Sequence, residues 1–198
     1  MRSTRISSQT LSAAAFSADG RRRWLILDRD GVINHDRAAY VRSPADWHPI
    51  AGALAAIARL HRAGFGLAVA TNQSGVGRGY FDLPTLNAIH AKMLAAVAAA
   101  GGRLDALAYC PHAPDAHCAC RKPKPGLLLR LMDECGFVPA DAVMIGDAAR
   151  DIEAARAAGM PAIAVGERAD VLAKTHAVPG FPTLAAAADW LLEDHWPC

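Results

Sequence analysis

The chain has 198 residues, of which 53% are hydrophobic and 20% are charged, so it has enough apolar material for the core of one α/β domain. Its formal net charge is +2 and its one basic run is Arg21–Arg23, which excludes the broad positive surface of a nucleic-acid-binding protein. No apolar stretch approaches the roughly 18–20 residues of a membrane span. We therefore expect a cytoplasmic protein with neither nucleic acid nor a membrane as a partner.

The first part of the chain lacks the pattern of a folded element. Residues 1–22 are mostly polar, and their apolar part is too short for the hydrophobic region of a secretory signal. We predict that residues 1–22 form a disordered extension and that residues 23–198 form a single domain.

Short apolar runs alternate with helical patterns through the rest of the chain. We expect strands at 24–28, 65–71, 104–110, 142–147 and 161–166, and helices at 50–64, 82–100, 127–136, 149–160 and 182–192. Gly64 is expected to end the first of these helices, and Asp82 to cap the start of the second. This alternation predicts an α/β fold with a doubly wound parallel sheet and right-handed crossovers.

Polar side chains follow three of the first four predicted strands. Asp28 and Asp30 come at the end of the first strand, Thr71 ends the second, and Asp147 ends the fourth. Ligand sites in open parallel sheets lie beyond the carboxyl ends of the strands, so we expect these side chains to converge. Neighbouring carboxylates repel each other unless a hard cation lies among them, which predicts Asp28, Asp30 and Asp147 as Mg²⁺ ligands. The alternative is that the first two merely form the turn before Gly31.

These side chains suit the transfer of a phosphoryl group. With a metal present, Asp28 could attack phosphorus, and Asp30 could protonate the leaving alcohol and later deprotonate the attacking water. We expect Lys122 and Thr71 to bind the transferring group, which completes the predicted catalytic set. Arg29, between the two aspartates, is expected to point to the opposite face and is assigned no chemistry.

Two segments are candidates for binding the substrate. The loop TNQSGVGRG supplies amide and hydroxyl groups from Asn72, Gln73 and Ser74 near the expected position of the phosphoryl group. Arg121, next to Lys122, has a planar guanidinium that suits a second anionic or hydroxyl-bearing group. Its alternative role is that of a solvated charge in a loop.

The stretch CPHAPDAHCAC contains a candidate metal site. Its three thiols and one imidazole lie within eleven residues, at Cys110, His112, Cys118 and Cys120. Four such ligands close a tetrahedral zinc site, leaving no open position for catalysis, so we expect a structural zinc. His117 could also ligate, but we choose His112 because it pairs with Cys110 across one proline. A buried thiol cluster or a disulfide is the alternative. A zinc here would also fix the adjoining Arg121 and Lys122.

Four motifs together resemble the haloacid dehalogenase superfamily of aspartate-nucleophile phosphatases. They are ILDRDGVIN, ATNQSGVGRG, CRKPKPG and MIGDAARD, in this order. The stretch CPHAPDAHCACRKPKPG resembles the zinc-containing branch that holds the heptose bisphosphate and histidinol-phosphate phosphatases. Within that branch, TNQSGVGRGYF more closely resembles the D-glycero-D-manno-heptose 1,7-bisphosphate 7-phosphatase family. The resemblance implies a Rossmann-like fold and Asp28 as nucleophile, with Mg²⁺ bound by Asp147 and the backbone carbonyl of Asp30. It also implies that Arg121 and the loop near Asp36 and Tyr40 recognise the sugar.

The implied activity is hydrolysis of this sugar bisphosphate at position 7, in ADP-heptose biosynthesis for lipopolysaccharide. The alternatives are a histidinol-phosphate phosphatase and a non-catalytic, zinc-stabilised binding module on the same scaffold. No long insertion is apparent, which implies little or no cap domain and an open site. Ala148 stands where some members of the family carry lysine, so no polar side chain from this position reaches the substrate. We expect a monomer, because no exposed apolar helix face stands out.

Overall fold

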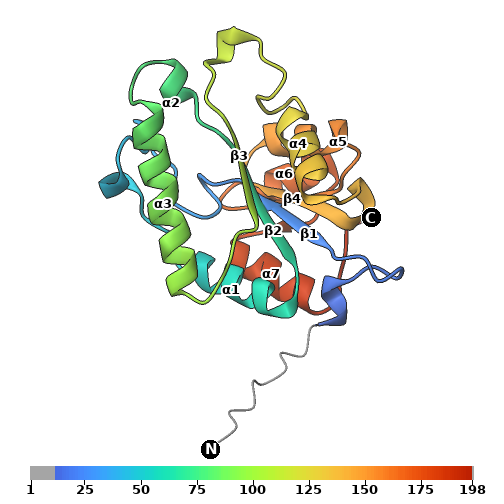
Figure 1. Ribbon diagram of the computed structural model, residues 1–198. Coiled ribbons are helices and arrows are strands. Elements are labelled where there is room, and N and C mark those ends of the chain that lie inside the picture. Colours follow the sequence, from blue (N-terminus) through green and yellow to red (C-terminus); the bar gives the residue numbers. More distant parts are fainter. Residues whose placement is uncertain (1–11, 198) are drawn as a thin grey trace, which may run out of the picture.

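Short apolar runs, most of them buried on both faces, form the central sheet of the computed structural model, which describes residues 12–197 (Figure 1). The strands are β1 (Trp24–Leu27), β2 (Gly66–Asn72), β3 (Ala106–Cys110), β4 (Ala142–Gly146), β5 (Ala162–Val165) and β6 (Gly180–Phe181). All their pairings are parallel, and the order across the sheet is β3-β2-β1-β4-β5-β6. Ile26 at the centre pairs with Ala68 on one side and Met144 on the other.

Helices cover both faces of the sheet (Figure 1). One face carries α1 (Ala53–Ala63), α3 (Leu83–Ala99) and α7 (Leu184–Leu192), and the other carries α4 (Gly126–Cys135), α5 (Ala149–Ala157) and α6 (Ala169–His176). The short helices are α2 (Ser74–Gly77), η1 (Ala13–Ala15), η2 (Pro44–Asp46), η3 (Pro114–Ala116) and η4 (Pro139–Asp141). Each face of the sheet therefore has its own hydrophobic core, and the predicted doubly wound α/β fold is confirmed.

Local signals place two of the helix ends. Gly64 ends α1 with a φ of 109°, and its N–H donates to the carbonyls of Leu60 and His61. Asp82 caps α3 by accepting a hydrogen bond from the backbone N–H of Thr85, at 2.9 Å. The sequence predicted neither α6 nor β6. β6 has only two residues and makes too short an apolar run to detect.

Residues 12–22, which we predicted to belong to a disordered extension, have a defined place in the structure. Residues 1–11 lie outside the described part of the chain, but residues 12–22 pack on the domain. The backbone N–H of Ser12 donates to the carbonyl of Ala63, and Ala14 and Ala15 are buried in the core beside α7. Arg22 donates to the carbonyls of Gly64 and Phe65. Alanine side chains are small enough to fit here, and these polar contacts hold the segment in place, so residues 12–22 form part of the described fold.

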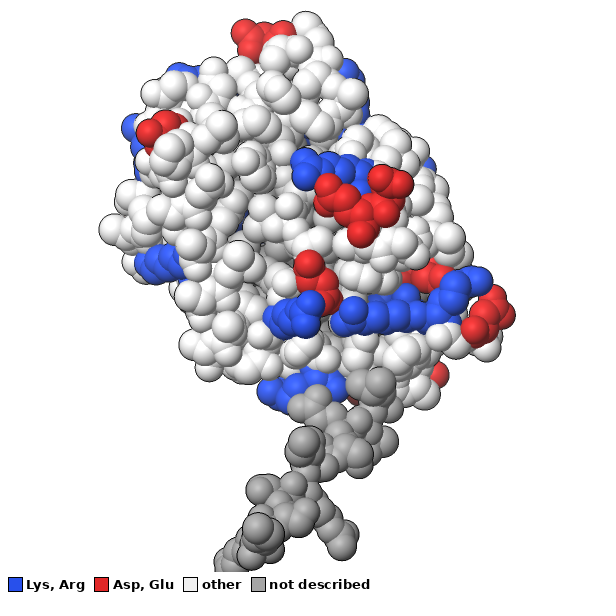
Figure 2. Space-filling view, in the orientation of Figure 1, with Lys and Arg blue, Asp and Glu red and all other residues white. Residues whose placement is uncertain are grey.

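In the part of the chain that the structure describes, the connections at the carboxyl end of the sheet contain no inserted domain. Residues 28–52 link β1 to α1 and contain only η2, while α2 and α3 lie between β2 and β3. The described residues therefore contain no separate cap domain. Within residues 12–197, no helix has the length and apolar character needed to cross a membrane. On the face shown in Figure 2, basic side chains occur in small groups, several of them beside acidic ones.

Candidate active site and metal sites

Three carboxylates meet at the carboxyl end of the sheet. Asp28 follows β1, Asp147 follows β4, and Asp151 lies in the first turn of α5. One carboxylate oxygen from each lies within 4.8 Å of the others. The parallel pairing of β1 with β4 produces this approach, because it ends both strands at the same edge of the sheet.

The chemistry of this carboxylate cluster fits a hard cation. Burial raises the pKa of Asp28 to about 7 and that of Asp147 to about 6, because a desolvated carboxylate is less stable than its neutral form. Oδ1 of Asp147 is buried and has no hydrogen-bond partner among the described residues. Mg²⁺ prefers oxygen ligands, and its charge would stabilise the ionised form of these buried carboxylates. The residues present therefore fit a magnesium ion.

Lys122 is buried beneath these carboxylates. Its Nζ lies 3.1 Å from Asp28 and 2.7 Å from Asp151, and it donates to the carbonyl of Ala70 at 2.6 Å. Although burial favours the neutral amine, the two carboxylates hold the pKa of Lys122 above its usual value. Asn72 fixes the backbone, accepting from the N–H of Lys122 and donating to its carbonyl. The structure thus brings Lys122 to Asp28, as expected.

Asp30 lies apart from the carboxylate cluster. Its carboxylate accepts hydrogen bonds from Arg29, from Asn34 at 2.8 Å and from Gln73 at 2.9 Å. The Arg29 guanidinium reaches both oxygens of Asp30, at 2.9 and 2.8 Å. The prediction that Arg29 has no part in the site is therefore wrong. β1 ends at Leu27 and the chain then turns, so the alternation of a strand no longer applies.

A cavity of about 280 Å³ opens above Asp28. The predicted residues that line it are Asp28, Asp30, Asp36, Tyr40, Thr71, Asn72, Gln73, Ser74 and Arg121. Thr71 is buried and its hydroxyl accepts a hydrogen bond from Gln73 at 2.9 Å. Lys122 does not line the cavity, since it is buried below. The predicted substrate-binding residues other than Lys122 thus share one cavity with Asp28.

Two residues of α5 were missed by sequence reasoning. Asp151 pairs with Lys122 and accepts a hydrogen bond from the N–H of Ala148 at the start of the helix. Nη2 of Arg150 lies 3.9 Å from both Asp28 and Asp147, and its side chain lines the cavity. Positions three and four residues after Asp147 return to the same side of a helix, and this spacing could have identified them.

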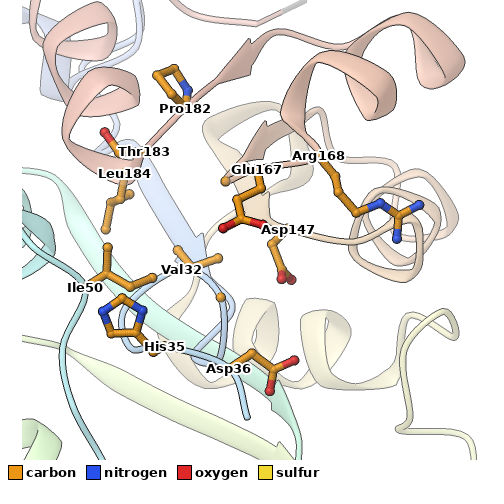
Figure 3. Close-up of a pocket in the computed structure, with 12 residues that line it drawn as sticks. Val32, His35, Asp36, Ile50, Asp147, Glu167, Arg168, Pro182, Thr183 and Leu184 are labelled. Atoms are coloured by element: carbon orange, nitrogen blue, oxygen red, sulfur yellow. The ribbon is translucent and has the colours of Figure 1, made fainter. Parts of the chain in front are cut away.

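Asp147 lines a second cavity, of about 370 Å³ (Figure 3). Val32, Ile50 and Leu184 lie to one side of the carboxylates of Asp147 and Glu167. No prediction addressed this cavity. Asp36 lines both this cavity and the cavity above Asp28, so the two hollows adjoin each other.

The cysteine cluster forms a second candidate metal centre after β3. Ligand atoms of Cys110, His112, Cys118 and Cys120 all lie within 4.8 Å of one another. Nδ1 of His112 is 3.5 Å from the Cys110 sulfur and 3.3 Å from the Cys120 sulfur, whereas His117 is not part of this group. Although burial opposes it, hydrogen bonds lower the pKa of the Cys118 thiol to about 6, whereas burial raises the pKa of the neighbouring Cys110 thiol to about 12. Three sulfurs and one imidazole nitrogen fit a zinc ion.

The fold and the aspartate cluster define a hydrolase of the haloacid dehalogenase type. The profile of the haloacid dehalogenase-like hydrolases matches residues 6–159. The chain belongs to this family, and the resemblance seen in its motifs is confirmed.

Named relatives are similar over most of the chain. The D-glycero-beta-D-manno-heptose-1,7-bisphosphate 7-phosphatase of Pseudomonas aeruginosa is 44% identical over 176 residues, which cover 87% of this chain and 99% of that protein. The protein of the same name from Bordetella bronchiseptica is 45% identical over 177 residues, covering 86% and 98%. A crystal structure of D,D-heptose 1,7-bisphosphate phosphatase from B. bronchiseptica, complexed with magnesium and phosphate, has a TM-score of 0.82. At 44% identity, it covers 87% of this chain and 99% of that one.

Proposed function

We propose that the protein is a Mg²⁺-dependent phosphatase that hydrolyses D-glycero-β-D-manno-heptose 1,7-bisphosphate at position 7. The observation that carries this proposal is the Asp28 carboxylate, which lies in a polar cavity beside Lys122 and two further carboxylates. The named relatives, 44–45% identical over most of the chain, support the choice of substrate.

The proposed reaction has two displacements at phosphorus. An Asp28 oxygen forms a bond to phosphorus as the bond from phosphorus to O7 of the sugar breaks, and Asp30 gives its proton to that oxygen. Water then attacks the aspartyl-phosphate, Asp30 takes up a proton from it, and phosphate leaves with Asp28 restored. Arg29, Asn34 and Gln73 support this role by holding the Asp30 carboxylate at the cavity.

Both proposed metals have residues suited to them. Asp28, Asp147 and the backbone carbonyl of Asp30 would hold Mg²⁺, with Asp151 near them. Bound there, Mg²⁺ neutralises charge on the phosphoryl oxygens. Cys110, His112, Cys118 and Cys120 would hold Zn²⁺, with a structural role because four protein ligands leave no open position.

We further infer that the sugar and its second phosphate occupy the cavity beside Asp36, Tyr40 and Arg121. Nη1 of Arg121 is buried without a hydrogen-bond partner among residues 12–197, so it has a donor to offer an anion. A cytoplasmic location is supported by the cysteine cluster, whose thiols keep their metal-binding form in a reducing compartment. A monomeric state is supported by the exposed large apolar side chains among the described residues, which are spread over α3, α4, α6 and the loops.

Replacing the proposed nucleophile tests the mechanism. Asp28→Asn should lower kcat for the heptose bisphosphate at least about a thousandfold, because an amide cannot form the aspartyl-phosphate. The exposed Asp133→Asn on α4 is the matched control and should keep its activity. Phosphate release by Asp28→Asn at the unaltered rate would contradict the nucleophile assignment.

Comparing substrates tests the specificity. The measurement is kcat/KM of the unaltered protein for the β and α anomers of heptose 1,7-bisphosphate and for histidinol phosphate. We expect the β anomer to have the highest value. A clear preference for histidinol phosphate would overturn the proposed substrate while leaving the proposed reaction in place.

A further inference from the structure

The amino group of Lys122 is already surrounded by oxygens of the protein. Its Nζ donates to the carbonyl of Ala70 at 2.6 Å and forms ion pairs with Asp151 at 2.7 Å and Asp28 at 3.1 Å, and the side chain is fully buried. A phosphoryl group on Asp28 would therefore compete with these oxygens for the charge of Lys122.

Arg150, unlike Lys122, reaches the cavity and has unused hydrogen-bond donors. Its side chain is 42% exposed and lines the cavity, and Nη2 lies 3.9 Å from both Asp28 and Asp147, beyond hydrogen-bonding range. Its Nε is buried and has no hydrogen-bond partner within the described residues. A buried N–H without a partner is unfavourable, and an anion that reached it would remove that penalty. Arg150 thus has positive charge and unused donors directed at the atoms around Asp28.

Two other arginines of the cavity are already engaged. Arg29 is bound to both oxygens of Asp30, and Arg37 pairs with Asp46 at 3.2 Å. Within the described part of the chain, Arg150 forms no ion pair of this kind, and its nearest carboxylates lie at 3.9 Å. Of these three arginines, it has the most freedom to bind an anion that arrives beside Asp28.

We propose that Arg150 binds the phosphoryl group that is transferred to Asp28, donating from its guanidinium to the non-bridging oxygens. This inference rests on the proposed phosphatase function and adds a residue to the site. A planar guanidinium matches two oxygens of a phosphoryl group at once, which a lysine cannot do. Lys122 then holds Asp28 from below, while Arg150 holds the phosphoryl group from the cavity.

The test measures binding of inorganic phosphate to the full chain in the presence of Mg²⁺ and Zn²⁺ by isothermal titration calorimetry. Arg150→Met should raise Kd for phosphate on the order of tenfold or more and lower kcat/KM about a hundredfold. Arg150→Lys keeps the charge but loses the bidentate contact, so its Kd and its kcat/KM should lie between those of Arg150→Met and those of the unaltered protein. Arg156→Met, which changes an exposed arginine of the same helix, is the matched control and should leave both values unaltered.

The outcomes separate this inference from the proposed function. If Arg150→Met binds phosphate as tightly as the unaltered protein, the inference is overturned and the phosphatase proposal stands. If the unaltered protein neither binds phosphate nor releases it from a phosphate ester, the proposed function falls, and the inference falls with it. Thermal melting of each variant, which should match that of Arg156→Met, shows that a loss of binding does not come from unfolding.

Discussion

Gly31, in the loop after β1, lies directly against the carboxylate of Asp147. Its φ is +79°, in the left-handed region that side chains with a Cβ rarely adopt. A Cβ at this position would overlap the carboxylate of Asp147. The absence of a side chain at Gly31 therefore lets the chain turn here and lets Asp147 lie beside Asp28.

Gly31→Ala should harm the site as well as the fold. The left-handed backbone costs about 1–2 kcal/mol for alanine, and the overlap additionally displaces Asp147, so Mg²⁺ affinity and kcat should both fall at least about tenfold. Gly136→Ala is the matched control, because Gly136 has a φ of +71° and open space around it. Denaturant unfolding and Mg²⁺ titration of both variants make the comparison. Equal Mg²⁺ affinity in the two would contradict the proposed role of Gly31.

At the scale of single residues, the sequence predicted those that stand at strand ends. Asp28, Thr71 and Asp147 were found because polar side chains at the carboxyl ends of buried parallel strands mark the ligand site of such a sheet. Arg29 could not be placed, since the direction of its side chain depends on a turn after β1 that strand alternation does not describe. Arg150 could have been found from its position three residues after Asp147, at the start of a predicted helix.

The element that links the two candidate metal sites is the loop from Cys110 to Gly126. It leaves β3 at the cysteine cluster and reaches Lys122 only two residues after Cys120. Nζ of Lys124 donates to the carbonyls of His117 and Cys118, which closes the loop on itself. A metal in the cluster would therefore hold the segment that carries both Arg121 and Lys122.

Cys118→Ser should weaken this support. Loss of one thiolate should reduce the zinc content, lower the melting temperature and lower kcat/KM about tenfold or more, because Arg121 and Lys122 lose their fixed position. Cys135→Ser, which alters a cysteine of α4 outside the cluster, should change none of the three. Elemental analysis measures the zinc content, thermal unfolding the melting temperature, and steady-state kinetics kcat/KM. Full activity in a zinc-free Cys118→Ser protein would rule out the supporting role.

Among the elements, long or strongly apolar segments were predicted and short ones were not. β1, β2 and β4 are buried along almost their entire length and appear in the sequence as uninterrupted apolar runs. β6 pairs only two residues with β5, and η1 consists of three alanines. Both depend on packing against neighbours that are remote in sequence, and a local pattern cannot reveal that.

For the molecule as a whole, the buried carboxylates couple stability to pH and to metal. The raised pKa values mean that Asp28 and Asp147 favour the folded state when protonated. Without a divalent cation, their contribution to the free energy of unfolding is present below about pH 4. It is lost as the pH rises through about 6 for Asp147 and about 7 for Asp28. Binding of Mg²⁺ requires the ionised carboxylates and should therefore release protons.

The gain in melting temperature on adding Mg²⁺ should accordingly be larger at about pH 8 than at about pH 5. Calorimetry of the unaltered protein with and without Mg²⁺ measures this gain. In Asp147→Asn the gain should be small at both pH values, because one ligand is missing. A gain that is the same at both pH values in the unaltered protein would show that Mg²⁺ binding is not linked to these two carboxylates.

The buried contacts of Lys122 also bear on the order in which the protein folds. Its amino group joins the loop after β3 to β2, to the end of β1 and to α5. Its contact in β2, Ala70, lies 52 residues before Lys122 in the chain. Before those segments meet, the chain has to close several long loops, and a charged amine gains nothing from leaving water. Lys122 can therefore become buried only when β1, β2 and α5 are all in place. Catalytic activity that returns during refolding thus reports the assembly of the whole sheet edge, and not of any single strand–helix unit.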